Sequence, residues 1–353
     1  LYYREAREQA NAVRGIYRYS FEGGEKPELI SPRTGHFMSL FSISSDAKFI
    51  ALTIGDRMHE NTSIWILDLR RNVLQRLTTE AGEQANPLFS PDGDWIYYSS
   101  FNDNNEWKGL YRRKRGDRSI DGAEPIDEGP RPCVVQSISP DGNHLFVGEL
   151  PDEQISPGTS YDIAVISLGQ NGEKAIRTVW AGGPKMQGVP MVSPDGHYVA
   201  YASWHTGQSE VYVRPFDSSE KSDLEYQVSN NGGDWARWST DGKILYYIEK
   251  EQNTQSKLMA AIVLTDLRKA VDGELPRFEI AEVKELFGFG RTLKGFEQFF
   301  EIMPDGTGLL RTDIVSPAGD KEIYDDLAVI QVVRNFFTEL ERVAPTKNRR
   351  TKR

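Results

Sequence analysis

The chain has 353 residues, more than most single domains contain, but all-β propellers and barrels reach this length as one unit. Its 42 Lys and Arg against 52 Asp and Glu give a net charge of −10, which argues against a general binder of nucleic acid or anionic membranes, because such proteins present a basic surface. With 31 Gly, 18 Pro, 16 Phe, 15 Tyr and 7 Trp, the composition favours a β-rich chain with many turns.

Strand-like stretches follow one another along the whole chain. Residues 15–21 and 27–30 resemble the third and fourth strands of a sheet, arriving before any first strand. Later stretches are β-branched and aromatic, and those that predict the second, third or fourth strand of a repeat are 63–69, 73–78, 94–100, 161–166, 197–203, 210–215, 226–229 and 243–248. The first and second strands of the last repeat are expected near 299–303 and 309–314.

A repeat organises these stretches. A short apolar run, then Ser-Pro-Asp-Gly or a close variant, then an aromatic-rich run occurs six times, and successive aspartates lie 46, 49, 54, 46 and 64 residues apart. Spacings of this size are typical of four-stranded propeller blades. The sequence therefore predicts an all-β fold, a six-bladed β-propeller of four-stranded antiparallel blades in which both chain ends share the last blade. The aspartates are Asp46, Asp92, Asp141, Asp195, Asp241 and Asp305.

The six aspartates have a structural interpretation. In a tight turn, proline presets φ, aspartate accepts hydrogen bonds from nearby backbone donors and glycine accepts a positive φ. Repetition at one topological position makes these aspartates turn caps rather than catalytic carboxylates. Two copies depart from the motif, with Ala47 in place of glycine and Thr240 in place of proline.

At these motifs the chain resembles the TolB-like six-bladed propellers, which have WD40-like repeats. It resembles more closely the propeller at the C-terminal end of some bacterial membrane-associated serine/threonine kinases and related sensor proteins. The phrases that carry this resemblance are 209–216 (Ser-Glu-Val-Tyr-Val-Arg-Pro-Phe), 227–229 (Gln-Val-Ser), 236–242 (Ala-Arg-Trp-Ser-Thr-Asp-Gly) and 329–340. It implies an extracytoplasmic position, in the periplasm or at the cell surface, and a tether to an upstream membrane-anchored domain.

The propeller is expected to occupy residues 1–345 as a single domain, followed by a basic flexible tail at 346–353. Residues 328–337 fit either a strand or the start of a short helix that continues to Val343. No apolar run approaches the roughly 20 residues that a membrane-spanning helix needs.

The motifs of several enzyme classes are absent from the sequence. It contains no kinase phosphate loop or catalytic loop, no Gly-x-Ser-x-Gly nucleophile elbow and no zincin motif among its five histidines. One cysteine, Cys133, excludes internal disulfides and multi-cysteine metal sites. Residues 102–106 (Asn-Asp-Asn-Asn-Glu) carry oxygen ligands that suit calcium but lack EF-hand spacing, so an ordinary loop is the preferred interpretation. We therefore expect no cofactor and no metal site.

Propeller topology predicts where a ligand binds. The loops between second and third strands (56–61, 101–107, 151–160, 204–208 and 251–255) and the connections between blades must share one mouth of the central channel. Varied loops on a rigid scaffold are where recognition is usually built. The residues that we select there for ligand binding are Asn86, Trp107, Arg131, Lys185, Trp204, His205, Trp235 and Arg237.

The sequence thus favours a non-catalytic recognition or sensor propeller, within a larger bacterial signalling protein, that binds a protein, peptide or glycan and no nucleic acid. Cations and aromatic rings at the mouth of an acidic protein suggest a ligand with carboxylate or planar groups. A propeller enzyme of lyase or hydrolase type, or the accessory propeller of a peptidase, is the alternative. Its acid and base groups would come from His36, Asp56, His59, His205 and Asp234. A third alternative is a scaffold with a flat apolar docking surface.

Overall fold

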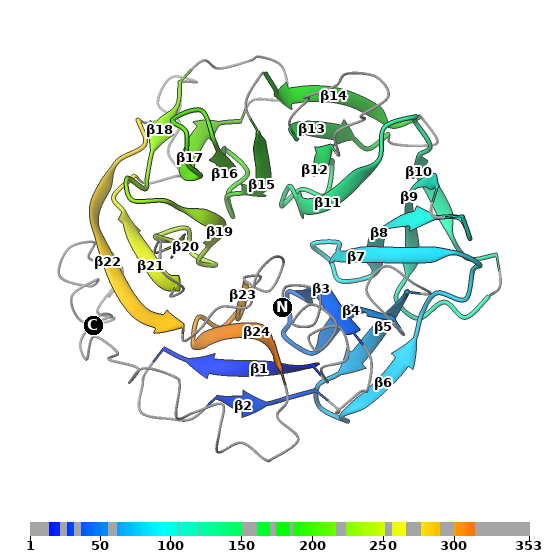
Figure 1. Cartoon of the computed structure of the whole chain (residues 1–353). Coiled ribbons are helices and arrows are strands. Elements are labelled where there is room, and N and C mark those ends of the chain that lie inside the picture. The colour runs from blue at the N-terminus through cyan, green and yellow to red at the C-terminus, as the bar shows by residue number, and fades with distance from the viewer. Residues whose placement is uncertain are drawn as a thin grey trace, which may run out of the picture.

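The computed structural model describes residues 14–21, 27–31, 37–55, 62–104, 106–119, 121–149, 161–169, 174–183, 186–216, 224–250, 256–265, 277–289 and 300–314. These residues form six four-stranded antiparallel sheets arranged around a central axis, as the sequence predicts (Figure 1). The predicted segment 328–343 and the tail 346–353 lie outside the described residues. No helix in the described part of the chain is long and apolar enough to cross a membrane.

Five blades are built from consecutive strands, which we call a to d from the channel outwards. Blade 1 has β3 (Phe37–Ile43), β4 (Phe49–Gly55), β5 (Ser63–Asp68) and β6 (Val73–Arg76). Blade 2 has β7 (Glu83–Phe89), β8 (Trp95–Phe101), β9 (Trp107–Lys114) and β10 (Glu124–Asp127). Blade 3 has β11 (Cys133–Ile138), β12 (His144–Glu149), β13 (Asp162–Ser167) and β14 (Ile176–Ala181). Blade 4 has β15 (Gln187–Val192), β16 (Tyr198–Ser203), β17 (Glu210–Pro215) and β18 (Tyr226–Gln227). Blade 5 has β19 (Asp234–Trp238), β20 (Ile244–Lys250), β21 (Ser256–Val263) and β22 (Ile280–Phe289).

Blade 6 closes the ring with strands from both ends of the chain. Strands a and b are β23 (Phe300–Ile302) and β24 (Gly308–Ile314), and strands c and d are β1 (Arg14–Ser20) and β2 (Glu28–Leu29). β1 pairs with β24 over seven residues, from Arg14 opposite Ile314 to Ser20 opposite Gly308. The predicted closure is therefore confirmed, and it leaves no open edge on β24.

The core lies between the blades, where the apolar faces of neighbouring sheets meet. Central strands are buried on both faces, and every residue of β16 is buried. One apolar cluster joins Ile16 of blade 6, Phe41 of blade 1 and Tyr246 of blade 5, so packing crosses the closure. Phe21, just after β1, stacks on Tyr246 with ring centroids 5.2 Å apart. Ring closure is thus held by side-chain packing as well as by strand pairing.

The Asp-Gly turns join strands a and b at one end of the blades, which we call the turn face together with the c–d turns. In blade 2, Oδ1 of Asp92 accepts hydrogen bonds from the Ser90 hydroxyl at 2.5 Å and from the backbone N–H of Asp94 at 3.0 Å. The hydrogen bond from Ser90 lowers the pKa of Asp92. The other five aspartates also accept the N–H of the residue two positions ahead. Ala47 adopts the left-handed backbone at φ 54° that glycine holds elsewhere.

The opposite end, which we call the loop face, carries the b–c loops and the connections between blades. Just below it, strand a is bulged in blades 1 to 5, because the register shifts within β3, β7, β11, β15 and β19. Asn86, Val189 and Trp235 occupy three of these bulges with φ between 52° and 57°. A bulge re-aims the side chain that it contains, so the loop face cannot be read from strand alternation alone.

Candidate functional site

Two of the predicted mouth residues belong to the channel wall. Trp235 is 7% exposed and packs in the apolar cluster that joins blades 1, 5 and 6. Arg237 is 3% exposed, and its Nε lies 3.1 Å from a carboxylate oxygen of Glu301 in β23. Burial raises the pKa of Glu301, and the charge of Arg237 opposes that rise. Trp235 and Arg237 therefore hold blades 5 and 6 together, and a role for them in ligand binding stays a prediction.

The predicted cation Arg131 also holds blades together. Its Nη1 lies 2.9 Å from Glu149 at the end of β12, while Arg177 of β14 contacts Glu149 at 2.8 Å and Asp127 of β10 at 3.0 Å. Because Glu149 is 4% exposed and Arg177 is mostly buried, these pairs form a rigid link between blades 2 and 3. Burial raises the pKa of the adjacent Asp162, and the charge of Glu149 adds to this. The charge of Arg131 is therefore offset by a buried carboxylate.

Three further predicted residues, Asn86, Trp107 and Trp204, lie towards the loop face in blades 2 and 4. Trp107 donates its indole N–H to the carbonyl of Gly129 at 2.9 Å and meets Phe101 edge-on. Asn86 occupies the bulge of β7, and its N–H donates to the Thr53 hydroxyl at 3.2 Å. Trp204 is half-buried at the start of the blade 4 b–c loop. Lys185, His36, Asp56 and His59 lie outside the described residues.

His205 is turned towards the outer part of blade 4. Its ring lies 4.5 Å from that of Tyr212, its Nδ1 is 3.1 Å from the Ser203 hydroxyl, and it is 4.0 Å from a carboxylate oxygen of Glu225. Glu225 also accepts a hydrogen bond from the Tyr201 hydroxyl. Burial raises the pKa of Tyr201, and Glu225 raises it further. This cluster therefore fixes the b–c loop of blade 4 against its outer strands.

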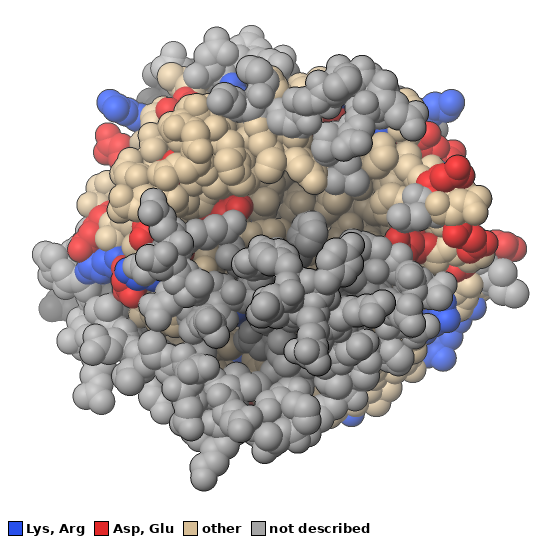
Figure 2. Space-filling view, in the orientation of Figure 1, with Lys and Arg blue, Asp and Glu red and all other residues tan. Residues whose placement is uncertain are grey.

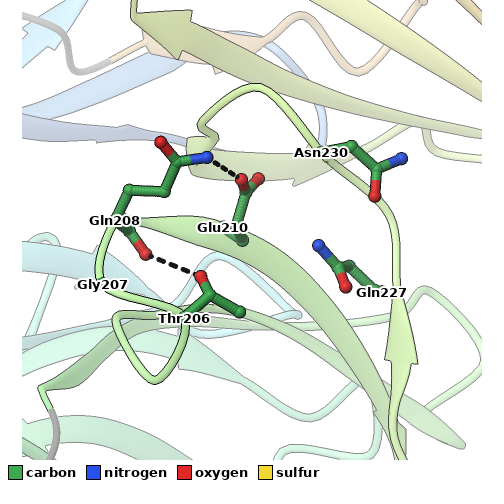
Figure 3. A pocket seen from close by; sticks show the side chains of 6 residues that line it. All are labelled: Thr206, Gly207, Gln208, Glu210, Gln227 and Asn230. Carbon is green, nitrogen blue, oxygen red and sulfur yellow. Dashed lines mark hydrogen bonds between the residues drawn. The ribbon is translucent and has the colours of Figure 1, made fainter.

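Beside this cluster, blade 4 has a hollow of about 400 Å³ that opens to solvent (Figure 3). The b–c loop, the start of β17, the end of β18 and the connection to blade 5 contribute its walls. The lining residues are Thr206, Gly207, Gln208, Glu210, Gln227 and Asn230. Figure 3 shows the side chains of Gln227 and Asn230 on one side of the hollow and those of Thr206, Gln208 and Glu210 on the other.

The buried carboxylate of Glu210 holds the walls of the hollow together through hydrogen bonds. This residue is 1% exposed, and its carboxylate accepts hydrogen bonds from the Gln208 amide at 2.5 Å, from the N–H of Gly232 at 3.0 Å and from the Ser229 hydroxyl. Buried polar groups are normally satisfied by hydrogen bonds, and the carboxylate of Glu210 is satisfied by these three donors. Glu210 thereby fastens the b–c loop to the connection that leads into blade 5.

Sequence reasoning found one wall of this hollow and missed the other. Thr206 and Gln208 lie within the predicted mouth loop 204–208. Gln227 ends β18 and Asn230 follows that strand, and the sequence pointed to neither as a ligand-binding residue, although the phrase 227–229 carries part of the family resemblance. Isolated amide side chains carry no sequence signal, so only the blade geometry could bring them together. At residues 102–106, where the sequence favours an ordinary loop over a calcium site, Oδ1 of Asn102 accepts the N–H of Asn104 and of Glu106. Within the described residues, no group of three or more His, Cys, Asp or Glu is placed to hold a metal ion.

Comparisons with known proteins agree with the architecture. A family model described as the N-terminal beta-propeller domain of prolyl oligopeptidase matches residues 182–269, which span blade 4 and most of blade 5. A protein of Agrobacterium tumefaciens described as TolB shares 16% identity with a TM-score of 0.63, over 86% of this chain and 99% of its own. TolB of Acinetobacter baumannii shares 16% identity with a TM-score of 0.52, over 80% and 69%.

An oligogalacturonate lyase of Vibrio parahaemolyticus is also similar, with 12% identity and a TM-score of 0.51 over 87% of this chain and 98% of its own. No protein with a curated sequence matches the chain. At these identities the likeness shows the fold alone, a six-bladed β-propeller, which proteins with and without enzymatic names share.

Proposed function

We propose that the chain is a non-catalytic recognition propeller that binds a protein segment, peptide or glycan at its loop face, with the blade 4 hollow as the contact site. The observation that carries this proposal is the hollow itself, which is lined by hydroxyl and amide groups and is held together by the hydrogen bonds that Glu210 accepts. Such groups both donate and accept hydrogen bonds, so they suit backbone amides and sugar hydroxyls.

The charges around the site support a ligand that does not depend on anionic groups. Arg131, Arg177 and Arg237 are each paired with a carboxylate, and the one ionisable group that lines the hollow is Glu210. Since Glu210 already accepts three hydrogen bonds, it is not poised as the acid or base that a propeller enzyme would need.

The proposal extends to cellular context. On the resemblance of residues 209–216 and 236–242 to sensor propellers of bacterial membrane-associated kinases, we infer that this propeller is the extracytoplasmic recognition part of a larger signalling protein. The ligand would then be encountered outside the cytoplasm, where peptides and glycans of the cell envelope are accessible.

The test is a binding screen followed by titration. The folded chain is screened on arrays of oligosaccharides and of short peptides, and the strongest-binding array member is titrated against Gln227→Ala, Asn230→Ala and the turn-face control Asn143→Ala. Loss of one hydrogen bond should weaken binding by about two- to tenfold in each loop-face variant and leave the control unchanged. Weaker binding in the control, with both loop-face variants intact, would put the site on the wrong face. Conversion of the bound array member into products would instead favour the enzyme alternative.

A further inference from the structure

Four arginines gather on the turn face where blades 1 and 2 meet, and we call them the basic edge: Arg70, Arg71, Arg115 and Arg118. Arg70 and Arg71 lie in the turn between β5 and β6, and the other two lie in the connection that follows β9. Figure 2 shows Lys and Arg side chains together with Asp and Glu side chains along the right-hand rim of the molecule. Asp68, Asp94 and Asp117 lie in or beside the turns that carry the four arginines.

Contacts between the blades bring these arginines together. The guanidinium of Arg115 lies 4.0 Å from the ring centroid of Phe49, and Phe49 is the β4 residue paired with Asp68, two residues before Arg70. Arg118 donates from Nη2 to the side-chain carbonyl of Gln75 in β6 at 3.0 Å. The blade 2 connection therefore packs on blade 1 next to the turn that carries Arg70 and Arg71.

A buried arginine holds this connection in place. Arg113 is 1% exposed, and its Nη1 lies 2.6 Å from a carboxylate oxygen of Glu80. It also donates to the carbonyl of Ser119, while its Nε is 3.9 Å from Asp117. Arg113 thus pairs with Glu80 and lies close to Asp117, so Arg115 and Arg118 sit on an anchored segment rather than on a free loop.

Among the described residues, most arginines of the basic edge lack a carboxylate partner, whereas Arg131 and Arg237 are each paired with one. Arg70, Arg115 and Arg118 form no ion pair with a carboxylate in the described ranges, and Arg71, 82% exposed, is 3.9 Å from Asp68. Oδ1 of Asp68 accepts the backbone N–H groups of Arg70 and Arg71. Three guanidinium groups therefore keep their charge available to an external anion. Guanidinium groups bind carboxylates through paired hydrogen bonds, which makes an arginine cluster suited to acidic side chains.

We propose that the basic edge binds a short acidic segment of a partner protein, a function separate from ligand binding at the loop face. A short segment senses the potential only within about 8 Å at physiological salt, so it responds to the arginines that it contacts rather than to the net charge of the chain. A nucleic acid or a membrane extends much further and would meet the acidic remainder of the chain, so both fit this surface less well.

The test uses a fluorescently labelled peptide of alternating Glu and Gly residues. Its anisotropy is titrated with the full chain at about 10 mM and about 150 mM salt, where the Debye length falls from about 30 Å to about 8 Å. The double variant Arg70→Glu with Arg118→Glu should weaken binding at least about fivefold. The charge-matched control, Lys174→Glu with Arg277→Glu, reverses two exposed basic side chains on blades 3 and 5 and should leave the affinity unchanged.

Three results would overturn the proposal. The first is equal weakening in the two double variants, which would show that the peptide senses only net charge. The second is absence of peptide binding at low salt. The third is binding of a DNA duplex, or of vesicles containing phosphatidylglycerol, in preference to the peptide. Binding to the peptide that is lost only with the basic-edge variant would support the proposal. Far-ultraviolet circular dichroism and urea unfolding establish that both variants are folded, since all four substituted side chains are surface groups.

Discussion

Removal of β1 should destroy the ring, because the two ends of the chain meet in blade 6. β1 and the residue after it contribute four buried apolar side chains, those of Ile16, Tyr17, Tyr19 and Phe21. At about 1.5–3 kcal/mol for each buried side chain, they contribute about 6–12 kcal/mol, which is comparable to the whole stability of a typical protein of about 5–15 kcal/mol. Deletion of residues 1–30 should therefore yield no stable monomer, and the exposed edge of β24 should promote aggregation.

Point substitutions on β1 measure how much its buried side chains contribute to stability. Ile16 is fully buried, so Ile16→Ala should lower the free energy of unfolding by about 2–5 kcal/mol. Arg18→Ala, on the same strand, removes an exposed pair with Glu28 and should cost at most about 1 kcal/mol. Urea denaturation followed by tryptophan fluorescence measures both variants, and size-exclusion chromatography measures the truncated chain. A truncated monomer that melts like the parent, or equal effects of Ile16→Ala and Arg18→Ala, would refute the reasoning.

Three further predictions concern ionisable groups. Hydrogen bonds from Lys48 and then Ser44 lower the pKa of Asp46 from 3.8 to about 2, so its stabilising contribution is present above pH about 4 and is lost as the pH falls towards 2. Asp46→Asn should reduce the fall in the free energy of unfolding, measured with urea, between about pH 4 and about pH 2. An unchanged slope of that free energy against pH would count against this. Asp92→Ala should cost about 1 kcal/mol in the same assay and leave loop-face binding intact; abolished binding at unchanged stability would make Asp92 functional. Arg237→Met should cost about 3–5 kcal/mol by stranding Glu301, and adding Glu301→Leu should restore most of it, so a double variant no more stable than the single one would contradict the interpretation.

The fold could be predicted from the sequence because its signals are local. The hydrogen bonds that make the turn around Asp92 join residues no more than five positions apart, from Ser90 to Trp95, so the motif carries its own structure. The spacing of the turns then gave the number of blades. The early strands at residues 15–21 and 27–30 indicated how the ring closes, since strands c and d had no a or b before them.

The candidate site depends on contacts between residues that lie far apart in the sequence, and no local motif predicts such contacts. Arg237 was selected for ligand binding, and the structure pairs it with Glu301, 64 residues away in another blade. The hollow of blade 4 combines a b–c loop with Gln227 at the end of β18 and Asn230 after it, and the basic edge combines turns from two blades. A guanidinium group forms the same ion pair with a blade as with a ligand, so residue type alone could not distinguish them. Only the packing of one sheet on the next determines which charged side chains form ion pairs within the protein and which remain accessible to a partner.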